Sequence, residues 1–347
     1  MKVLHVIDTL NIGGAEKVCL DLTRMLLDAG HQADCMVISA KGPLYNKLDN
    51  RSEVFFLARN SKYNIFKMHR CAALTSGYDI VHVHMRHTWV YLRLACLIFS
   101  PSIRLIFHDH YGDIAIDQKT TYRLRGLFKP RFYIGVSREL TRWAIAKLKI
   151  NETSVFLLEN TSVPHYGYSD RYQGDWVMVS NLRSTKNILF AIRMAIKMKR
   201  KLVIFGNPDS SLYAKEALKF AENSEYAKVV QNETNVEQYF GNFKLAIHTA
   251  LSETGPLVLL EYMAHGLPFI TSSTGEVVSK IREDLAIFIA STFDEEEWEK
   301  SISYLEGEIR SNGEALKQKL QNLFNEKFSP KNYLDQCLKI YQNVLAS

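Results

Sequence analysis

Several residue groups in this chain have the types and spacing needed to bind a phosphorylated ligand. The first is Gly13-Gly14, which follows an apolar stretch and precedes an amphipathic segment. Glycines let backbone N–H groups approach an anion, and the N-terminus of a helix adds partial positive charge. The full dinucleotide-binding pattern GxGxxG is absent, so the pair taken alone favours a tight turn without a ligand.

A second group lies in the segment SETGPLVLLE, residues 252–261. Pro256 suits a first helical turn, where backbone N–H groups are left free to hold a phosphate. Glu261 follows in an apolar run, where a carboxylate is costly unless its partner offers hydroxyls or a cation, and a ribose diol would meet that need. The alternative is a capped core helix. The expected nucleotide-binding residues of this segment are Thr254, Gly255, Pro256, Leu257, Val258 and Glu261.

Two more candidates follow apolar stretches of the second half. Lys186 lies between such a stretch and a helical pattern, where its ammonium can meet a diphosphate as a point charge. Gly206 ends the stretch VIFG, where it either lies near a nucleotide or simply turns the chain.

Histidines form the last group. His108 and His110 flank Asp109 directly after the stretch RLIF, so either can face a ligand at the end of a strand. A structural role is the alternative for both. Three further histidines lie in HVHMRH, and we interpret them as strand and loop residues rather than metal ligands: His82, His84 and His87.

These candidates need strands and helices to position them, and the chain supplies two sets. The first half alternates apolar, strand-like runs with helical patterns. The runs expected as strands in this half are 2–8, 32–39, 53–58, 79–84, 104–110, 133–137 and 154–160. A Pro-, Gly- and Tyr-rich stretch at 161–174 then predicts a linker and hinge.

A second alternation follows the linker. The strands expected here are 175–182, 201–207, 227–232, 244–250 and 266–272, with helices at 187–199, 211–222, 256–265 and 275–283. A charged helical tail covers about 293–345. We therefore predict an α/β protein with two Rossmann-like domains, residues 1–165 and 166–347, whose C-terminal helix packs on its own domain or back on the first.

Length and charge agree with this division. The chain has 347 residues, 47% of them apolar, which exceeds the usual size of one hydrophobic core. Residues 1–165 carry 22 basic and 14 acidic residues, whereas the remainder carries 21 and 23. A basic first half predicts an anionic partner, such as a membrane surface or a lipid-linked phosphate, although a plain solvated surface is an alternative.

The cellular setting is also constrained. The five cysteines form no CxxC pair, which favours a reducing compartment. The N-terminal apolar run is followed by Asp8 and a Gly turn instead of a cleavage site. The most apolar later stretch, 89–107, is broken by Arg93, Pro101 and Arg104, which argues against a membrane span. We therefore expect a cytoplasmic protein that binds the inner face of the plasma membrane peripherally.

The motifs taken together resemble glycosyltransferase family 4, the retaining glycosyl transferases group 1 with the GT-B fold. The resemblance covers nearly the whole chain, through two glutamates separated by seven residues and through NIGGAEKV, YDIVHVH, IGVSREL, LLENTSVP and GLPFITSSTGEV. It implies two Rossmann-like domains facing a central cleft. One departure is Asn181, which stands where the family usually has an Arg, and Arg183 is the candidate replacement.

The resemblance also implies a reaction. A hexosyl unit passes from a nucleotide diphosphate sugar, with a UDP-sugar as the expected donor, to a glycan or lipid-linked acceptor of a bacterial surface polysaccharide. His108 would contact the donor sugar, Glu253 its hydroxyls, and Glu261 the ribose. Lys186 and Arg183 would bind the diphosphate, so neither a metal nor another cofactor is expected.

Three other functions are alternatives. A nicotinamide-dependent oxidoreductase lacks its glycine fingerprint here. A non-catalytic nucleotide-sugar-binding or membrane-surface scaffold stays open because of Asn181. Binding of nucleic acid through the basic half would give steep salt dependence without any need for Glu253, and we do not expect it.

Overall fold

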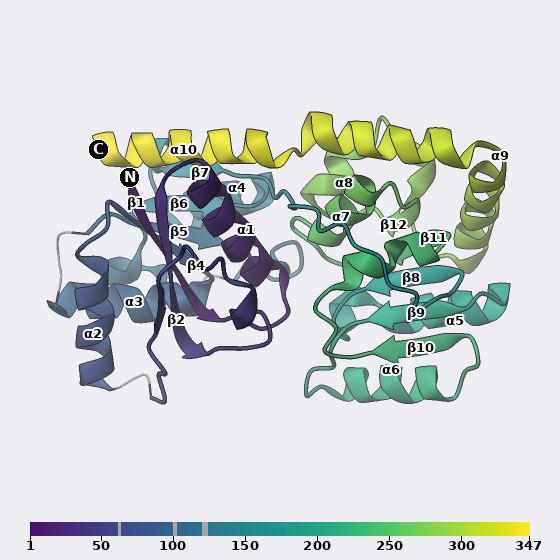
Figure 1. The fold of residues 1–347 in the computed structure, drawn as a ribbon, viewed down its shortest axis with the longest axis horizontal. Helices are drawn as coiled ribbons and strands as arrows, with labels where there is room; N and C mark the ends of the chain where they lie inside the picture. Colours follow the sequence, from purple (N-terminus) through teal and green to yellow (C-terminus); the bar gives the residue numbers. More distant parts are fainter. Residues whose placement is uncertain (62–63, 100–102, 120–123) are drawn as a thin grey trace. The chain divides into compact units, whose positions relative to one another are not determined.

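The computed structural model describes residues 1–61, 64–99, 103–119 and 124–347. The chain forms two compact units: unit 1 contains residues 1–161 and 330–347, and unit 2 contains residues 162–329. The chain therefore leaves unit 1 within the stretch expected as a linker and returns to it before the last helix. Figure 1 shows the helices and strands of each unit.

Unit 1 is built on a seven-stranded parallel sheet with the order β3-β2-β1-β4-β5-β6-β7. Its strands are β1 (Lys2–Thr9), β2 (Gln32–Ala40), β3 (Val54–Phe56), β4 (Ile80–His84), β5 (Leu105–Asp109), β6 (Phe132–Gly135) and β7 (Val155–Leu157). Its helices are α1 (Gly14–Asp28), α2 (Ile65–Thr75), α3 (Arg86–Phe99), α4 (Arg138–Leu148) and α10 (Pro330–Ala346).

The two faces of this sheet carry different side chains, because neighbouring residues of a strand point to opposite faces. Leu4 and Val6 of β1 belong to the main apolar core, together with residues of α2, α3 and α4. His5, between them, pairs in register with His82 of β4, and His84 pairs with His108 of β5. The central strands therefore present apolar side chains to one face and a row of histidines to the other.

Unit 2 has a six-stranded parallel sheet with the order β10-β9-β8-β11-β12-β13. Its strands are β8 (Trp176–Val179), β9 (Leu202–Phe205), β10 (Ala227–Val230), β11 (Leu245–His248), β12 (Phe269–Ser272) and β13 (Ile289–Ala290). Its helices are α5 (Ile188–Met198), α6 (Leu212–Glu222), α7 (Leu257–His265), α8 (Gly275–Ile281) and α9 (Glu295–Lys327). The four helices expected before the tail lie within two residues of α5 to α8, and the expected doubly wound α/β fold is confirmed.

The helical tail differs from the expected domain limits. It consists of α9, which is bent where Asn312 leaves helical geometry, and of α10. The expected second domain, residues 166–347, includes α10, with packing back on the first domain as an option. In the structure α10 is part of unit 1. Its Tyr341 hydroxyl lies 2.7 Å from Nδ1 of His82, and the Ser347 carbonyl accepts a hydrogen bond from Arg131. These contacts explain why α10 leaves the domain that precedes it in sequence.

Among the described residues, no helix is both long and apolar enough to span a bilayer.

Candidate functional site

Lys186 is presented by a short turn at the carboxyl end of β8. This turn is the 3-10 helix η5 (Ser184–Lys186), and Asn187 then adopts a left-handed conformation that redirects the chain into α5. Thr249, which follows β11, donates its hydroxyl to the carbonyls of Lys186 and Asn187 at 3.0 and 3.1 Å. The backbone N–H of Leu251 donates to the Thr185 carbonyl at 2.7 Å. The turn is therefore fixed to the loop that carries Glu253.

Glu253 lies in this second loop, between β11 and α7. Its Oε1 forms an ion pair with the Lys186 ammonium, and both side chains are mostly buried. The loop is held in place by α8, because the N–H of Glu276 donates to the Thr254 carbonyl at 2.8 Å. Gly275 has a φ of +88°, and a Cβ there would lie 3.2 Å from the Cβ of Glu253. A glycine therefore allows α8 to pack against the loop.

His248, the last residue of β11, lies beside this ion pair. Its Nε2 is 3.7 Å from Glu253 Oε1, and neither ring nitrogen has a hydrogen-bond partner among the described residues. Burial lowers its pKa to about 4, so the ring is neutral at pH 7. His248 was not among the residues predicted from the sequence, although its position at the carboxyl end of a strand was the available signal.

Helix α7 begins next to Glu253. Pro256 is its N-cap residue and Leu257 its first helical residue, so the N–H groups of Leu257 and Val258 have no carbonyl of a preceding turn to bond. Glu261 is buried one turn further along the helix. Thr254 is buried and Gly255 is half-buried in the loop before the helix.

Gly206 and Asn181, which stands where the family usually has an Arg, both hold the segment after β8 against the segment after β9. A Cβ on Gly206 would lie 1.9 Å from the Ser180 carbonyl oxygen, so β9 ends in close contact with the chain after β8. Asn181 Oδ1 accepts the N–H of Asn207 at 3.0 Å and links the same two segments. Arg183 is exposed, and its charge adds to the hydrogen bonds from Ser211 that lower the pKa of Asp209.

In unit 1, Gly13 and Gly14 start α1 as expected, but an acidic side chain lies against them. Gly13 is the N-cap residue in extended conformation, and Gly14 is the first helical residue. A Cβ on Gly13 would lie 2.4 Å from Glu16 Oε2, and Glu16 is buried. A carboxylate at this end compensates the helix dipole, and an anionic ligand would have to displace it.

His108 and His110 lie at the carboxyl end of β5. His108 is fully buried, and its Nε2 has no hydrogen-bond partner among the described residues. His110 is half-buried, with its Nε2 3.1 Å from Nδ1 of His84. Between them, the buried Asp109 binds Arg86 through both carboxylate oxygens, which fixes the end of the strand.

A polar group that was not predicted from the sequence lies at the same edge of the unit 1 sheet. Asp8, near the end of β1, accepts hydrogen bonds from Ser39 at 2.6 Å and from Arg59 at 3.0 Å. His87 Nε2 lies 3.4 Å from the other carboxylate oxygen. His87 was interpreted only as part of a strand-and-loop histidine pattern, and its pairing with Asp8 depends on the β1–β4 contact.

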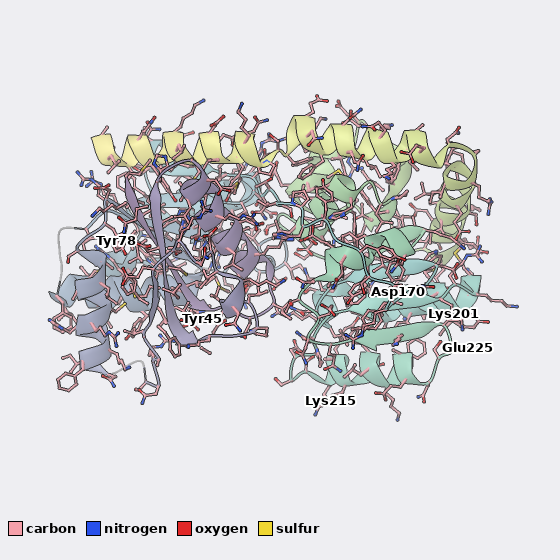
Figure 2. All side chains as sticks on the ribbon, in the orientation of Figure 1. Tyr45, Tyr78, Asp170, Lys201, Lys215 and Glu225 are labelled. Atoms are coloured by element: carbon pink, nitrogen blue, oxygen red, sulfur yellow. The ribbon has the colours of Figure 1, made fainter. Side chains whose placement is uncertain are left out.

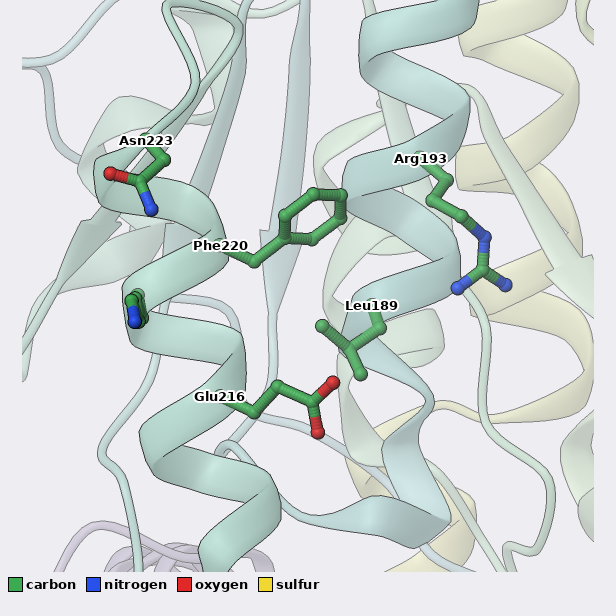
Figure 3. A pocket seen from close by; sticks show the side chains of 6 residues that line it. Leu189, Arg193, Glu216, Phe220 and Asn223 are labelled. Carbon is green, nitrogen blue, oxygen red and sulfur yellow. The ribbon is translucent and has the colours of Figure 1, made fainter.

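A shallow hollow between α5 and α6 contains none of the expected site residues. It is lined by Leu189, Arg193, Glu216, Lys219, Phe220 and Asn223, as Figure 3 shows. It lies between two helices and not at the carboxyl ends of strands, so we do not assign it to the ligand site.

The geometry brings one set of predicted residues together within unit 2: Lys186, Glu253 and the start of α7. Gly13, Gly14 and His108 belong to unit 1. Two Rossmann-like units, with these residues at the carboxyl ends of their strands, have the architecture of the GT-B fold.

The comparisons with known proteins identify the family. Residues 12–160 match the model of Glycosyltransferase Family 4, and residues 173–322 match that of Glycosyl transferases group 1. The chain belongs to this glycosyltransferase family. No curated protein matches it in sequence.

Solved structures share its fold at low sequence identity. Anabaena HepE in complex with UDP-glucose has a TM-score of 0.76 at 15% identity, over 98% of each chain. A mutant of S. aureus TarM in complex with fondaparinux, alpha-GlcNAc-glycerol and UDP has a TM-score of 0.74 at 12% identity, over 98% of this chain and 100% of that one. The lipopolysaccharide outer core galactosyltransferase WaaB has a TM-score of 0.65 at 14% identity, over 98% of this chain and 99% of that one.

Proposed function

We propose that this glycosyltransferase transfers a hexosyl unit from a UDP-sugar to a glycan or lipid-linked acceptor, with retention of anomeric configuration. The observation that carries the proposal is the Lys186–Glu253 ion pair beside the start of α7. It combines a cation for a diphosphate, a carboxylate for sugar hydroxyls and the N–H groups of a first helical turn for a phosphate within one loop cluster.

The leaving group in this reaction is UDP, and negative charge develops on its β-phosphate as the glycosidic bond breaks. Lys186 and the N–H groups of Leu257 and Val258 would stabilise that charge, since preorganised donors act most strongly where charge appears. These fixed charges and dipoles are the basis for proposing a metal-independent reaction. Arg183, which is exposed, would have to turn toward the phosphates to assist.

Glu253 and Glu261 serve different parts of the donor in this proposal. Glu253 holds hydroxyls of the sugar, and Glu261 holds the ribose. Glu253 is not assigned as a nucleophile, because its carboxylate is engaged by Lys186 and because a two-carboxylate glycosidase mechanism needs both groups around one bond. His108 is proposed to contact the donor sugar through Nε2, which is buried, so a neighbouring side chain would have to move aside for the sugar to reach it.

The acceptor is assigned to unit 1. Two of the similar structures are complexes with UDP-glucose and with alpha-GlcNAc-glycerol, and a third protein is a lipopolysaccharide galactosyltransferase, which supports a role in bacterial surface polysaccharide synthesis. Unit 1 also exposes Ile65 and Phe66 at the start of α2, on the same helix as the exposed Arg70. Apolar and basic side chains together favour an anionic membrane surface, so we propose peripheral binding at its cytoplasmic face.

The test is a transfer assay with a panel of UDP-, GDP- and ADP-sugars. We expect release of UDP from one UDP-sugar, an α-linked product from an α-linked donor by NMR, and unchanged rates in EDTA. An inverted product would exclude retention, and loss of activity in EDTA would exclude metal independence. Binding of UDP-sugars without hydrolysis or transfer to lipid-linked acceptors would favour the non-catalytic scaffold.

A further inference from the structure

We propose that the C-terminal helix sets the hydrogen-bonding direction of His108. Tyr341 of α10 and His82 of β4 are positioning residues that hold His108 with its Nε2 as the hydrogen-bearing nitrogen. The inference rests on the proposed function, in which that nitrogen meets the donor sugar.

The geometry is a continuous row of side chains across the histidine face of the unit 1 sheet. The Tyr341 hydroxyl oxygen lies 2.7 Å from Nδ1 of His82. Nε2 of His82 lies 2.9 Å from Nδ1 of His108. All three side chains are fully buried, so water does not compete for these contacts. The row ends at Nε2 of His108, which has no partner among the described residues.

The direction of the row follows from the number of protons available. Burial lowers the pKa of His82 and of His108 well below the usual value, so each neutral ring has one N–H and one lone pair. A proton donated at one end therefore fixes every tautomer along the row. Tyr341 can donate to the strong acceptor Nδ1 of His82, or it can direct its proton toward the sulfur of Cys337, a weak acceptor that also contacts it.

The Tyr341 hydroxyl forms the stronger hydrogen bond when it donates to Nδ1 of His82 than when it donates to the sulfur of Cys337. Nε2–H of His82 then donates to Nδ1 of His108, and the remaining N–H of His108 is on Nε2. A buried N–H without a partner is costly unless a ligand accepts from it. The oxygen of a sugar hydroxyl or of a departing phosphate is such an acceptor. With the opposite direction, His108 would present a lone pair there and could not stabilise an oxygen that gains negative charge.

A metal site is the competing interpretation of the same cluster. Donor atoms of His82, His84 and His108 lie within 4.8 Å of one another, as do those of His5, Cys19 and His84. However, Nε2 of His82 lies 2.9 Å from Nδ1 of His108, and Nε2 of His84 lies 3.1 Å from Nδ1 of His5, both hydrogen-bonding distances. Three lone pairs directed at one ion would require these hydrogen bonds to break. The hydrogen-bonded row accounts for both ring nitrogens of His82 and for Nδ1 of His108.

The test compares Tyr341→Phe with Tyr333→Phe. Tyr333 lies on the same helix, is also buried, and its hydroxyl has no hydrogen-bond partner among the described residues. Both substitutions remove one buried oxygen, but only the first removes the proton that fixes the row. The readouts are the ¹⁵N NMR tautomer state of His108 in histidine-labelled protein, assigned with His108→Gln, and kcat and KM for the donor.

We expect the parent and Tyr333→Phe to show a single Nε2–H tautomer of His108. Tyr341→Phe should show a mixture, with kcat about tenfold lower and KM nearly unchanged, the effect of one hydrogen bond to a reacting group. His82→Gln, as a second variant, should likewise lower kcat more than it raises KM.

Four results decide the inference. The inference would be overturned if the tautomer of His108 were unchanged in Tyr341→Phe. It would also be overturned if the parent were active and Tyr341→Phe and Tyr333→Phe had equal kcat. One equivalent of zinc in the purified protein, lost on His82→Gln, would also overturn it in favour of the metal site. If Tyr341→Phe changes the tautomer of His108 but the parent protein has no transferase activity, the inference about His108 holds and the proposed function is wrong. The two can therefore fail separately.

Discussion

The side chains of Lys186 and Glu253 form an ion pair although they are 67 positions apart in the sequence. Each comes from a loop at the carboxyl end of a strand, β8 for the lysine and β11 for the glutamate. These strands are neighbours in the sheet of unit 2, and Thr249 ties their loops together. The cation proposed for the diphosphate is therefore held by the carboxylate proposed for the sugar.

This pairing predicts that Glu253→Gln separates nucleotide binding from turnover. Without the carboxylate, the Lys186 ammonium is released for the phosphates, and we expect UDP to bind about fivefold more tightly, the equivalent of about 1 kcal/mol. Transfer should fall by about 100-fold or more, because the sugar loses a partner that positions it. Calorimetry with UDP and an assay of sugar transfer measure the two effects.

The matched control for this substitution is Glu216→Gln, an exposed glutamate on α6. It should leave both quantities unchanged. UDP affinity that falls together with activity in Glu253→Gln would contradict the competition between the carboxylate and the diphosphate.

Gly206→Ala should destabilise the protein. The added Cβ would lie 1.9 Å from the Ser180 carbonyl oxygen, and the backbone must shift to relieve the overlap. We expect a loss of about 2–3 kcal/mol in the free energy of unfolding. Gly307→Ala in α9 is the control, since no described atom outside the neighbouring helix backbone lies within 4 Å of its added Cβ, and it should stabilise slightly. Equal urea midpoints for Gly206→Ala and Gly307→Ala would contradict the close contact between Gly206 and the Ser180 carbonyl.

The buried histidines predict a loss of stability in mild acid. Burial lowers the pKa of His5 to about 3 and that of His248 to about 4. The unfolded chain binds these protons near pH 6.5, whereas the folded protein does not until pH 4 to 3. The stability from these groups is therefore full above pH 6.5 and falls by about 1.4 kcal/mol per pH unit for each of them below it.

Urea unfolding between pH 8 and pH 4.5 measures this dependence. His69→Gln, which removes an exposed histidine of α2, should leave the slope unchanged. A free energy of unfolding that stays constant from pH 7 to pH 5 would show that the histidines are accessible to protons in the folded state.

Membrane binding should depend on Phe66. Its side chain is 84% exposed at the start of α2, in the basic unit. We expect the protein to sediment with phosphatidylglycerol vesicles, and Phe66→Ser to weaken this binding about tenfold, the value of burying one phenylalanine. Leu212→Ser, 83% exposed in unit 2, is the control. Equal losses for both variants, or no binding by the parent, would contradict the proposed membrane surface.

The sequence predicted most of the fold because its signals are local. Apolar runs predicted the strands of both sheets, and Gly and Pro residues between these runs helped to predict the limits of α5 to α8. The two-residue strand β13 was missed because it is too short to carry a pattern. The packing of α10 on unit 1 was predicted only as one of two options, because it depends on Tyr341 and His82, which are 259 positions apart.

The candidate site was predicted in a similar way. Lys186, Glu253 and Pro256 were identified because each follows a strand, and unit 2 places them in adjoining loops. Their ion pair was not expected, since it depends on which strands are neighbours. His248 was overlooked because a histidine within an apolar strand gives no signal that its two ring nitrogens lack partners among the residues that the structure describes. Glu16 was overlooked because the sequence does not show that its side chain turns back toward Gly13.

The most direct measurement is the affinity for UDP of Lys186→Ala compared with Lys215→Ala. Lys215 is an exposed lysine on α6, labelled in Figure 2, so its substitution changes the net charge equally without touching the site. We predict that UDP stabilises the parent and Lys215→Ala against heat to the same extent. Lys186→Ala should bind UDP about 30-fold more weakly, the equivalent of about 2 kcal/mol for one charged contact. Equal stabilisation of all three proteins, or of none, would contradict the assignment of Lys186 to the diphosphate.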